Sequence, residues 1–473
     1  MRGRQGVLYN LSVLSLGQVI SQLANLAALL ILADQLGAHW FGVVQIGVAF
    51  MSYALITAEW GMMSLGIREV SRLDEPDAIL RYARQHTGLL ALQAALVFGL
   101  GLLILPRLPF YSHAPLVFLL YLASVLPQVY TQNWIAVGLE RMSWVGASRI
   151  VRSLVYCGLI LLLSFLDGKD GIQGAVWVPL SFLLAMLVSN LVVNFPVARW
   201  LGHFVHPHTV DWAEARRRWR ETGTIGVNII VLRLLFNIDI LMLGSLAAPE
   251  VAGNYAAAAR IIFLLVVAVE VLWAALLPRL SRLAKEPGPA FRRAFNLYFG
   301  LVAAILLPVA WGGFQLGDQI IAFVHRGQYP QAGPVFQVLA VSYSMLALAT
   351  FLGNTLLSED RQRLYSLPLL VASLVAVAGV RWLVPTHQEQ GASWAMLAAH
   401  GVLLVCLLAI NRDKLQRELG LFLLGLAPAL LAMMAVLVFL PPVHLLFRIG
   451  AAVMVYGAAA ALPARRFQAR LRA

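Results

Sequence analysis

Long apolar runs alternate with short polar segments over almost the whole chain, and most runs reach the roughly 20 residues that a helix needs to cross a bilayer. Charged residues, glycines and prolines mark where one run ends and the next begins. With these boundaries, the pattern predicts fourteen transmembrane helices at 8–33, 40–66, 85–105, 115–138, 146–166, 174–196, 222–246, 254–278, 294–316, 334–357, 366–385, 391–411, 420–440 and 443–462. The predicted fold class is an all-α polytopic membrane protein.

The basic residues give these helices an orientation. With the N-terminus placed inside the cell, 28 of the 35 lysines and arginines fall in inside segments and only 3 in outside loops. Cytoplasmic loops are enriched in positive residues, and one missed or extra helix would reverse every later loop and destroy the bias. The bias therefore supports the count of fourteen, with both termini cytoplasmic. Four arginines fall within the predicted helices or at their edges, namely Arg233, Arg260, Arg381 and Arg448.

The composition agrees with a membrane protein. Of the 473 residues, 60% are hydrophobic and 12% are charged, whereas soluble chains average about 25% charged residues. A net charge of +13 is also common in proteins that bind nucleic acid. Its placement here indicates membrane topology and contact with lipid headgroups, so we expect no nucleic-acid partner.

The polar segments limit the chemistry that the protein can perform. No predicted loop exceeds about 27 residues, which leaves no room for a folded catalytic domain, so we expect no enzyme and no catalytic residues. Cys157 and Cys406 lie within apolar runs, and the cluster of His203, His206 and His208 has no cysteine or acidic companions. We therefore expect no disulfide, no metal site and no cofactor.

Two distant stretches of the chain resemble each other. They read LGAHWFGVVQIGVAFMSYALITAEWGMMSLGIREVSRLDEP (36–76) and LAAPEVAGNYAAAARIIFLLVVAVEVLWAALLPRLSRLAKEP (246–287). Gly42 aligns with Gly253 and Glu59 with Glu270, and both stretches share Ser-Arg-Leu at the same offset of 210–211 residues. The period covers six helices, and an even number preserves orientation, so the repeats are parallel.

The repeat predicts two six-helix lobes around a central cavity. The expected domains are 1–210, an N-terminal lobe with an inner linker, then 211–411, a C-terminal lobe, and finally 412–473, two additional helices and a basic cytoplasmic tail. Within the linker segment 197–221, Trp212 and Trp219 are seven residues apart and share one helical face. Tryptophan and arginine both favour the headgroup layer, so we expect an amphipathic helix in the membrane interface.

Three polar residues interrupt the predicted helix 222–246. Asp239 lies at the same predicted depth as Arg260 on the next, antiparallel helix, and we expect the two to pair because a buried charge requires a partner. Arg233 lies near the midplane, and Asn237, four residues on, shares its face. Two alternatives stay open for Arg233, which either binds an anionic group in a wet cavity or pairs with another helix.

Two acids occupy matching positions in the repeat. Glu59 and Glu270 both fall inside predicted helices near the cytoplasmic side. Intramembrane acids are candidates for coupling to H+ or Na+, and Asp239 is a third such candidate. The alternative is capture of these carboxylates by inner-loop arginines such as Arg68 or Arg279.

A stripe of amides marks the first predicted helix. Gln18, Gln22 and Asn25 follow the spacing i, i+4, i+7 and therefore lie on one face. Such a stripe can line a cavity for ligands rich in hydroxyl groups. The alternative is a set of hydrogen bonds between helices, each worth about 0.6 kcal/mol.

Two stretches resemble one known family. TQNWIAVGLERMSWVGASRIVRSLV (131–155) resembles the Trp-x-x-x-Gly-x-Glu segment of Wzx-type oligosaccharide flippases, which belong to the multidrug/oligosaccharidyl-lipid/polysaccharide exporter superfamily. LGAHWFGVVQIGVAF and DILMLGSLAAPEVAGNYAAAARIIFLL resemble two further regions of the same proteins. The resemblance extends through about residue 411. Many such flippases have twelve helices, so the last two helices depart from the commonest pattern.

The resemblance implies that the protein translocates an undecaprenyl-diphosphate-linked oligosaccharide, such as an O-antigen or exopolysaccharide precursor, across the bacterial inner membrane. It also implies alternating access, coupling to H+ or Na+, and polysaccharide polymerase and export machinery as partners. The lipid tail can stay in the bilayer while a diphosphate pairs with arginines, which bind phosphate bidentately. The expected substrate-binding residues are Arg233, Asn237, Arg260, Arg149, Arg152, Gln18, Gln22 and Asn25.

Other functions remain as alternatives. A multidrug or cation antiporter of the same superfamily would need acids, rather than arginines, to dominate the cavity. An envelope polymerase or glycosyltransferase would need a sizeable outer loop, and a membrane scaffold would need none of these features. Lipid II flippases also have fourteen helices, but the first helix here has no basic residue between Leu8 and Ala33, unlike theirs.

Overall fold

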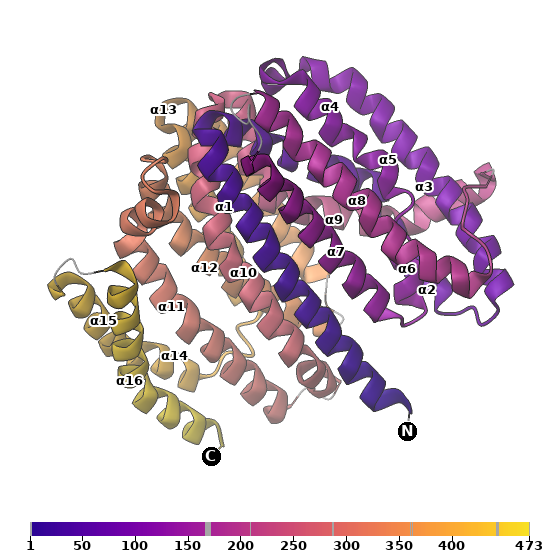
Figure 1. The fold of residues 1–473 in the computed structure, drawn as a ribbon. Coiled ribbons are helices and arrows are strands. Elements are labelled where there is room, and N and C mark those ends of the chain that lie inside the picture. Colours follow the sequence, from indigo (N-terminus) through magenta and orange to yellow (C-terminus); the bar gives the residue numbers. More distant parts are fainter. Residues whose placement is uncertain are drawn as a thin grey trace. The chain divides into compact units, whose positions relative to one another are not determined.

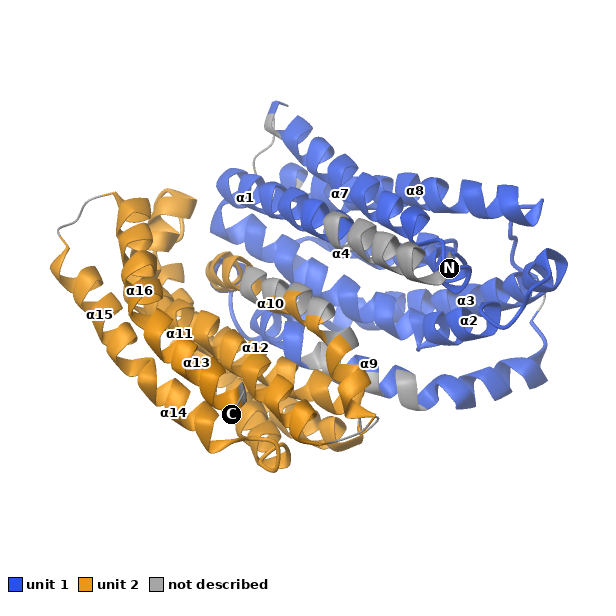
Figure 2. Cartoon of the chain, turned by 90° about the horizontal axis from the view of Figure 1, so that it is seen from below, with its two compact units in different colours: residues 1–253 blue, residues 254–473 orange. Residues whose placement is uncertain are grey.

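The computed structural model describes residues 2–165, 172–208, 210–285, 288–359, 361, 363–440 and 444–472. Over these ranges the chain is almost entirely helical and forms no strand (Figure 1). Its contacts divide it into two compact units, Met1–Gly253 and Asn254–Ala473 (Figure 2). The all-α fold class predicted from the sequence is confirmed.

The first unit is built from long helices joined by short helical segments. In chain order these are α1 (Arg2–Glu59), α2 (Met62–Val70), α3 (Pro76–Ile104), the 3-10 turns η1 (Leu105–Arg107) and η2 (Pro109–His113), α4 (Pro115–Ala123), α5 (Val125–Gln128), α6 (Asn133–Gly138), α7 (Met142–Phe165), α8 (Ile172–Leu201) and α9 (Trp212–Leu246). The helix α10 (Pro249–Ala284) begins in this unit and continues into the second.

The second unit contains six further helices. They are α11 (Pro289–His325), α12 (Ala332–Ser358), α13 (Arg363–Ile410), α14 (Arg417–Gly425), α15 (Ala427–Phe439) and α16 (Leu445–Arg472). The division at Gly253 keeps α9 with the first unit because α9 packs on α1. The lobe boundaries at residues 210 and 411, which follow the repeat, stay predictions.

Two of the long helices contain a break where the sequence predicts a loop. Gly37 interrupts α1 with φ 63° and ψ 176°, and Gln388 interrupts α13 with φ 49° and ψ −127°. Within the described ranges, nine helical stretches are long and apolar enough to cross a membrane, and these two breaks divide two of them. The shorter apolar helices Pro115–Gln128 and Leu235–Leu246, together with α10, complete the fourteen predicted segments.

The predicted helix 115–138 is wrong as a continuous element, because it consists of α4, α5 and α6. Pro127 has no N–H and cannot donate to the carbonyl group four residues earlier, which weakens the helix at this point. The chain leaves the helical path between Gln128 and Asn133. Broken helices are tolerated inside membranes only where other groups satisfy the freed backbone.

The predicted helix 40–66 also ends earlier than expected. It stops at Glu59, and the next two residues, Trp60 and Gly61, adopt φ values of 41° and 75°. The short helix α2 then begins at Met62. Glu59 therefore lies at the C-terminus of a helix and not within one.

The second half of the predicted linker, residues 212–221, forms the first turns of α9. Asp211 caps this helix by accepting a hydrogen bond from the Ala213 N–H at 3.0 Å, and the helix continues without interruption to Leu246. The rings of Trp212 and Trp219 lie 6.5 Å apart, which confirms that they share a face. The expected interfacial position of this segment stays a prediction.

The two repeat-matched glycines form a reciprocal close crossing. A Cβ atom on Gly42 would lie 1.9 Å from the carbonyl oxygen of Pro249, and one on Gly253 would lie 2.0 Å from that of Ala38. Only glycine allows two helix backbones to approach this closely. The two glycines that align in the sequence repeat therefore also have the same role in packing.

The last two membrane segments pack on α11. A buried cluster joins the three elements, with Leu316 from α11, Met433 from α15 and Tyr456 from α16 among its members. Arg448, one of the arginines placed by the sequence at the edge of a helix, is buried and donates to the Gln319 side chain at 2.7 Å and to the Leu437 carbonyl. Its role is to join these helices.

Candidate functional site

A stripe of polar side chains lies along the paired helices α1 and α7, which pack side by side in the first unit (Figure 1). We define the polar stripe by Gln18, Gln22 and Asn25 on α1 and by Arg149 and Arg152 on α7. Asn25 and both arginines are exposed, and the two glutamines are half-buried. Three of its five side chains are therefore exposed within the described part of the chain.

Small residues bring the two halves of the stripe together. A Cβ atom on Gly17 would lie 3.6 Å from the Cα atom of Gly146, so α1 and α7 approach closely at this level. One turn further along α7, Arg149 Nη1 donates to Gln18 Oε1 at 3.4 Å. Arg152 follows three residues later and lies on the same face of α7. Sequence reasoning selected both groups separately, and the fold makes them neighbours.

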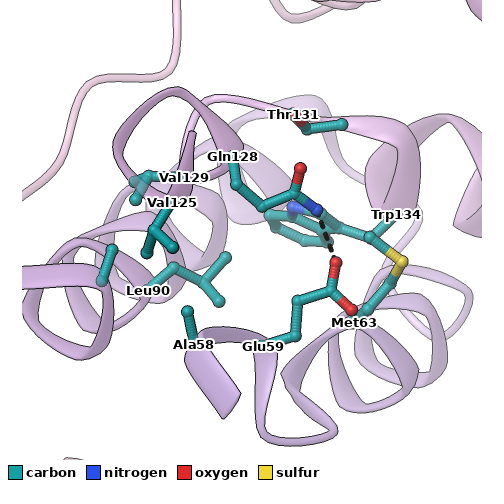
Figure 3. A pocket seen from close by; sticks show the side chains of 10 residues that line it. Ala58, Glu59, Met63, Leu90, Val125, Gln128, Val129, Thr131 and Trp134 are labelled. Carbon is teal, nitrogen blue, oxygen red and sulfur yellow. Dashed lines mark hydrogen bonds between the residues drawn. The ribbon is translucent and has the colours of Figure 1, made fainter. Parts of the chain in front are cut away.

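A second polar site lies where two helices of the first unit break. Gln128 Nε2 donates to Glu59 Oε1 at 2.5 Å beside a cavity of about 20 Å³ (Figure 3). Thr131, Met63 and the fully buried Trp134 also line this cavity (Figure 3). Its volume is close to the minimum that one water needs, so it has no room for a saccharide.

The cavity brings one carboxylate together with N–H donors. Glu59 ends α1, where the partial negative charge of the helix C-terminus disfavours a carboxylate. Gln128 offsets part of this cost by donating to the carboxylate. The indole N–H of Trp134 is buried and has no acceptor among the described residues. A buried donor of this kind usually indicates a bound water that accepts its hydrogen bond.

Two asparagines on α8 support the break behind this cavity. Asn190 Nδ2 donates to the Pro127 carbonyl at 2.8 Å, and its Oδ1 accepts from the Thr131 hydroxyl at 2.8 Å. Asn194 Nδ2 donates to the Tyr130 carbonyl at 2.7 Å. These amides replace hydrogen bonds that a continuous helix would make by itself.

A network of charges fastens the start of α9 to α3. Arg218 is buried, donates to Glu214 at 2.8 Å, and stacks over the ring of Tyr82 with its Cζ atom 4.6 Å from the ring centroid. Arg217 donates to both oxygens of Glu214, at 2.7 and 2.9 Å, and this hydrogen bonding holds the pKa of Glu214 below its ordinary value. The helix α2 is connected to this network through Arg68, which donates to Glu221 of α9 at 3.3 Å.

The structure describes the side chains of only some of the remaining predicted site residues. The side chains of Arg233 and Glu270 lie outside the described residues. Asp239 is buried, and its Oδ1 accepts from the Ile240 N–H at 2.8 Å. Asp239 and Arg260 fall in different units, so their pairing stays a prediction.

Two further predictions concern Asn237 and the capture of Glu59. Asn237 is buried on α9. Arg68 donates to Glu69 at 3.0 Å and to Glu221 at 3.3 Å, and the capture of Glu59 by an inner-loop arginine stays a prediction.

Sequence reasoning missed Gln128, Asn190 and Asn194. The signal for Gln128 was the neighbouring Pro127 inside an apolar run, which marks a helix break. The asparagines sit alone in α8, and no spacing rule connects them to residues about 60 positions earlier. Their role becomes visible only from the fold.

The described residues are almost entirely helical and include nine helical stretches long and apolar enough to cross a membrane, which together with the polar stripe are typical of a multi-pass membrane transporter. Its fold is that of the multidrug/oligosaccharidyl-lipid/polysaccharide exporter superfamily. Lipid II flippase MurJ in an inward closed conformation superposes with a TM-score of 0.77 over 96% of this chain and 99% of that one, at 13% identity. An inward-facing multidrug resistance transporter of the MATE family superposes with a TM-score of 0.65 over 85% of this chain and 98% of that one, at 16% identity.

The chain belongs to the polysaccharide biosynthesis protein family, whose model matches residues 7–284. A protein of Escherichia coli (strain K12) named "Putative O-antigen transporter" is 21% identical over 397 residues, which covers 81% of this chain and 91% of that protein. The predicted family resemblance is confirmed, and with it the assignment to membrane transport in polysaccharide biosynthesis.

Proposed function

We propose that the protein is a flippase that moves an undecaprenyl-diphosphate-linked oligosaccharide from the inner to the outer leaflet of the bacterial inner membrane by alternating access. The observation that carries this proposal is the polar stripe, in which amides and exposed arginines lie together on otherwise apolar helices. The family and the similarity to a protein named as an O-antigen transporter support the class of substrate.

The chemistry of the polar stripe fits both ends of such a substrate. Polar side chains of membrane helices face the bundle interior or a wet cavity rather than lipid. Amides such as Gln22 and Asn25 hydrogen-bond sugar hydroxyls, and Arg149 and Arg152 can bind a diphosphate bidentately. The predicted residues Arg233, Asn237 and Arg260 would extend this surface. The lipid tail would stay in the bilayer throughout.

Ion coupling, in this proposal, uses a separate place from substrate binding. The cavity beside Glu59 fits a water, a proton carrier or a small cation, but no sugar. Glu270 and Asp239 remain candidates for the same role. The antiporter alternative is less well supported because arginines and amides, rather than acids, make up the polar stripe.

The decisive experiment is deletion in a strain that lacks redundant flippases, followed by analysis of which leaflet holds the lipid-linked oligosaccharide. The proposal expects it to accumulate in the inner leaflet and polymerisation to stop, since the polymerase and export machinery act after translocation. Delivery to the outer leaflet at the wild-type rate would overturn the proposal.

Substrate binding is tested with single arginine variants. We expect Arg233→Ala and Arg149→Ala to abolish export at wild-type protein levels, and Arg233→Lys to retain part of it because the charge remains. The control is Arg141→Ala, because Arg141 is also exposed but lies over the Trp144 ring at the start of α7. Equal export by the Arg149 and Arg141 variants would remove the polar stripe from the mechanism.

A further inference from the structure

A groove of about 440 Å³ opens between α1, α3 and α9 of the first unit, apart from the polar stripe and the Glu59 cavity. Its lining joins two arginines of α9, Arg216 and Arg220, with the rings of Trp60 and Trp219 and with Leu96 of α3. We propose that this groove binds an anionic phospholipid of the inner leaflet, with the phosphodiester on the arginines and an acyl chain along α3.

The arginines of this segment divide into two kinds. Arg217 and Arg218 are both paired with Glu214. Arg216 and Arg220 are exposed, one turn apart on the groove side, and no carboxylate among the described residues pairs with either of them. Two adjacent unneutralised guanidinium groups match a phosphodiester, which each can bind through two N–H groups.

The aromatic floor of the groove is held in place. Gln93 is buried, and in the amide orientation that satisfies both of its ends it accepts from Trp219 Nε1 at 2.7 Å and donates to the Ala58 carbonyl at 3.1 Å. The ring of Trp60 packs against α9, where a Cβ atom on Gly226 would lie 3.0 Å from it. Tryptophans held at this level are typical of the headgroup layer.

An apolar wall continues from the groove along α3. Leu96, Leu100 and Leu103 are 50%, 55% and 64% exposed, and their spacing places them on one face. The arginines lie on the predicted cytoplasmic side, and α3 runs from that side towards the outside. A ligand that fills the groove and follows this face needs a charged head and a long apolar chain, which describes a phospholipid rather than a free phosphate.

The test is a titration of the purified full-length protein in detergent with phosphatidylglycerol or phosphatidylcholine, read by native mass spectrometry. A basic group near an anionic lipid is worth roughly 1 kcal/mol, or about fivefold in affinity. We therefore expect R216Q/R220Q to bind phosphatidylglycerol about 30-fold more weakly than wild type. The control R72Q/R217Q removes the same charge from exposed residues paired with acids and should change the affinity less than twofold.

Three outcomes would overturn the proposal. They are equal weakening in both double variants, equal affinity for the two lipids, and displacement of phosphatidylglycerol from the wild-type site by glycerophosphoglycerol or by undecaprenyl phosphate at equal concentration. The last would assign the groove to a free phosphate or to the lipid carrier instead. Unchanged melting temperatures of the variants would show that they are folded. The readout is binding and not export, so the result is independent of the proposed flippase activity.

Discussion

Asn190 offers the sharpest test of the broken helix between α4 and α6. Its amide spans the break, with one hydrogen bond to the Pro127 carbonyl and one from the Thr131 hydroxyl, both at 2.8 Å. Replacing Asn190 with leucine keeps the number and branching of the side-chain heavy atoms but removes both bonds. In membrane proteins a hydrogen bond between helices contributes about 0.6 kcal/mol on average.

The larger part of the loss in unfolding free energy comes from the polar groups that lose their hydrogen-bond partner. The buried Thr131 hydroxyl would lose the acceptor of its proton, at a cost of about 1–3 kcal/mol, and the Pro127 carbonyl would keep only the Tyr130 N–H as its donor. Together with the lost bonds, Asn190→Leu should lower the free energy of unfolding by about 2–4 kcal/mol. Asn194→Leu is the matched control on the same helix, and because Asn194 is half-buried, water can replace its bonds and the loss should be about 1 kcal/mol.

The assay is unfolding in mixed detergent micelles, with a double-mutant cycle between Asn190→Leu and Thr131→Val. Residues that share a hydrogen bond should show a coupling energy of at least about 0.5 kcal/mol. Equal losses for the two asparagine variants, or additive effects in the cycle, would refute the assignment of these amides as the support of the break.

Three further predictions follow from other parts of the chain. Gly253→Val should lower the unfolding free energy by at least about 1–3 kcal/mol, because its Cβ atom would lie 2.0 Å from the Ala38 carbonyl oxygen; a thermal melt equal to wild type would contradict the close crossing. Glu59→Gln should preserve folding but remove the dependence of export on the proton or sodium gradient, and an unchanged dependence in vesicles would exclude Glu59 from coupling. The pKa of Glu214 is lowered by hydrogen bonds from Arg217, so its stabilising effect is complete above its ordinary value of about 4.5 and is lost as the pH falls through the lowered pKa. Hydrogen exchange at the start of α9 should therefore quicken, beyond its intrinsic pH dependence, only in that acidic range, and a Glu214→Gln variant should show no such change.

The sequence predicts the membrane segments well because hydrophobicity along a helix is a local property. The predicted loops between helices 1 and 2 and between helices 11 and 12 coincide with the breaks at Gly37 and Gln388. The shared face of Gln18, Gln22 and Asn25 is likewise predictable, because it depends only on the spacing of residues within one helix. The family resemblance, which rests on short motifs in a fixed order, is also confirmed.

What the sequence could not supply is the pairing of distant residues. Hydropathy predicts one apolar helix over 115–138, because it contains no information on distant residues. The break is possible since Asn190, about 60 residues later, donates to the Pro127 carbonyl. For the same reason, Arg448 appears in the sequence as an isolated charge, although Gln319 and the Leu437 carbonyl surround its guanidinium group. Polar groups in membranes depend on partners, and partners depend on the fold.

The helix α1 connects the two polar sites of the first unit. Its first segment carries Gln18 and Asn25 of the polar stripe, and its second segment ends at Glu59 beside the small cavity. The cavity is too small for a sugar, so the proposed mechanism places substrate and ion at separate sites, and an element that touches both sites can couple them. In the proposed mechanism α1 is that element, and Gly37 is the point where its two segments can change their angle, since a glycine accepts the left-handed conformation without strain.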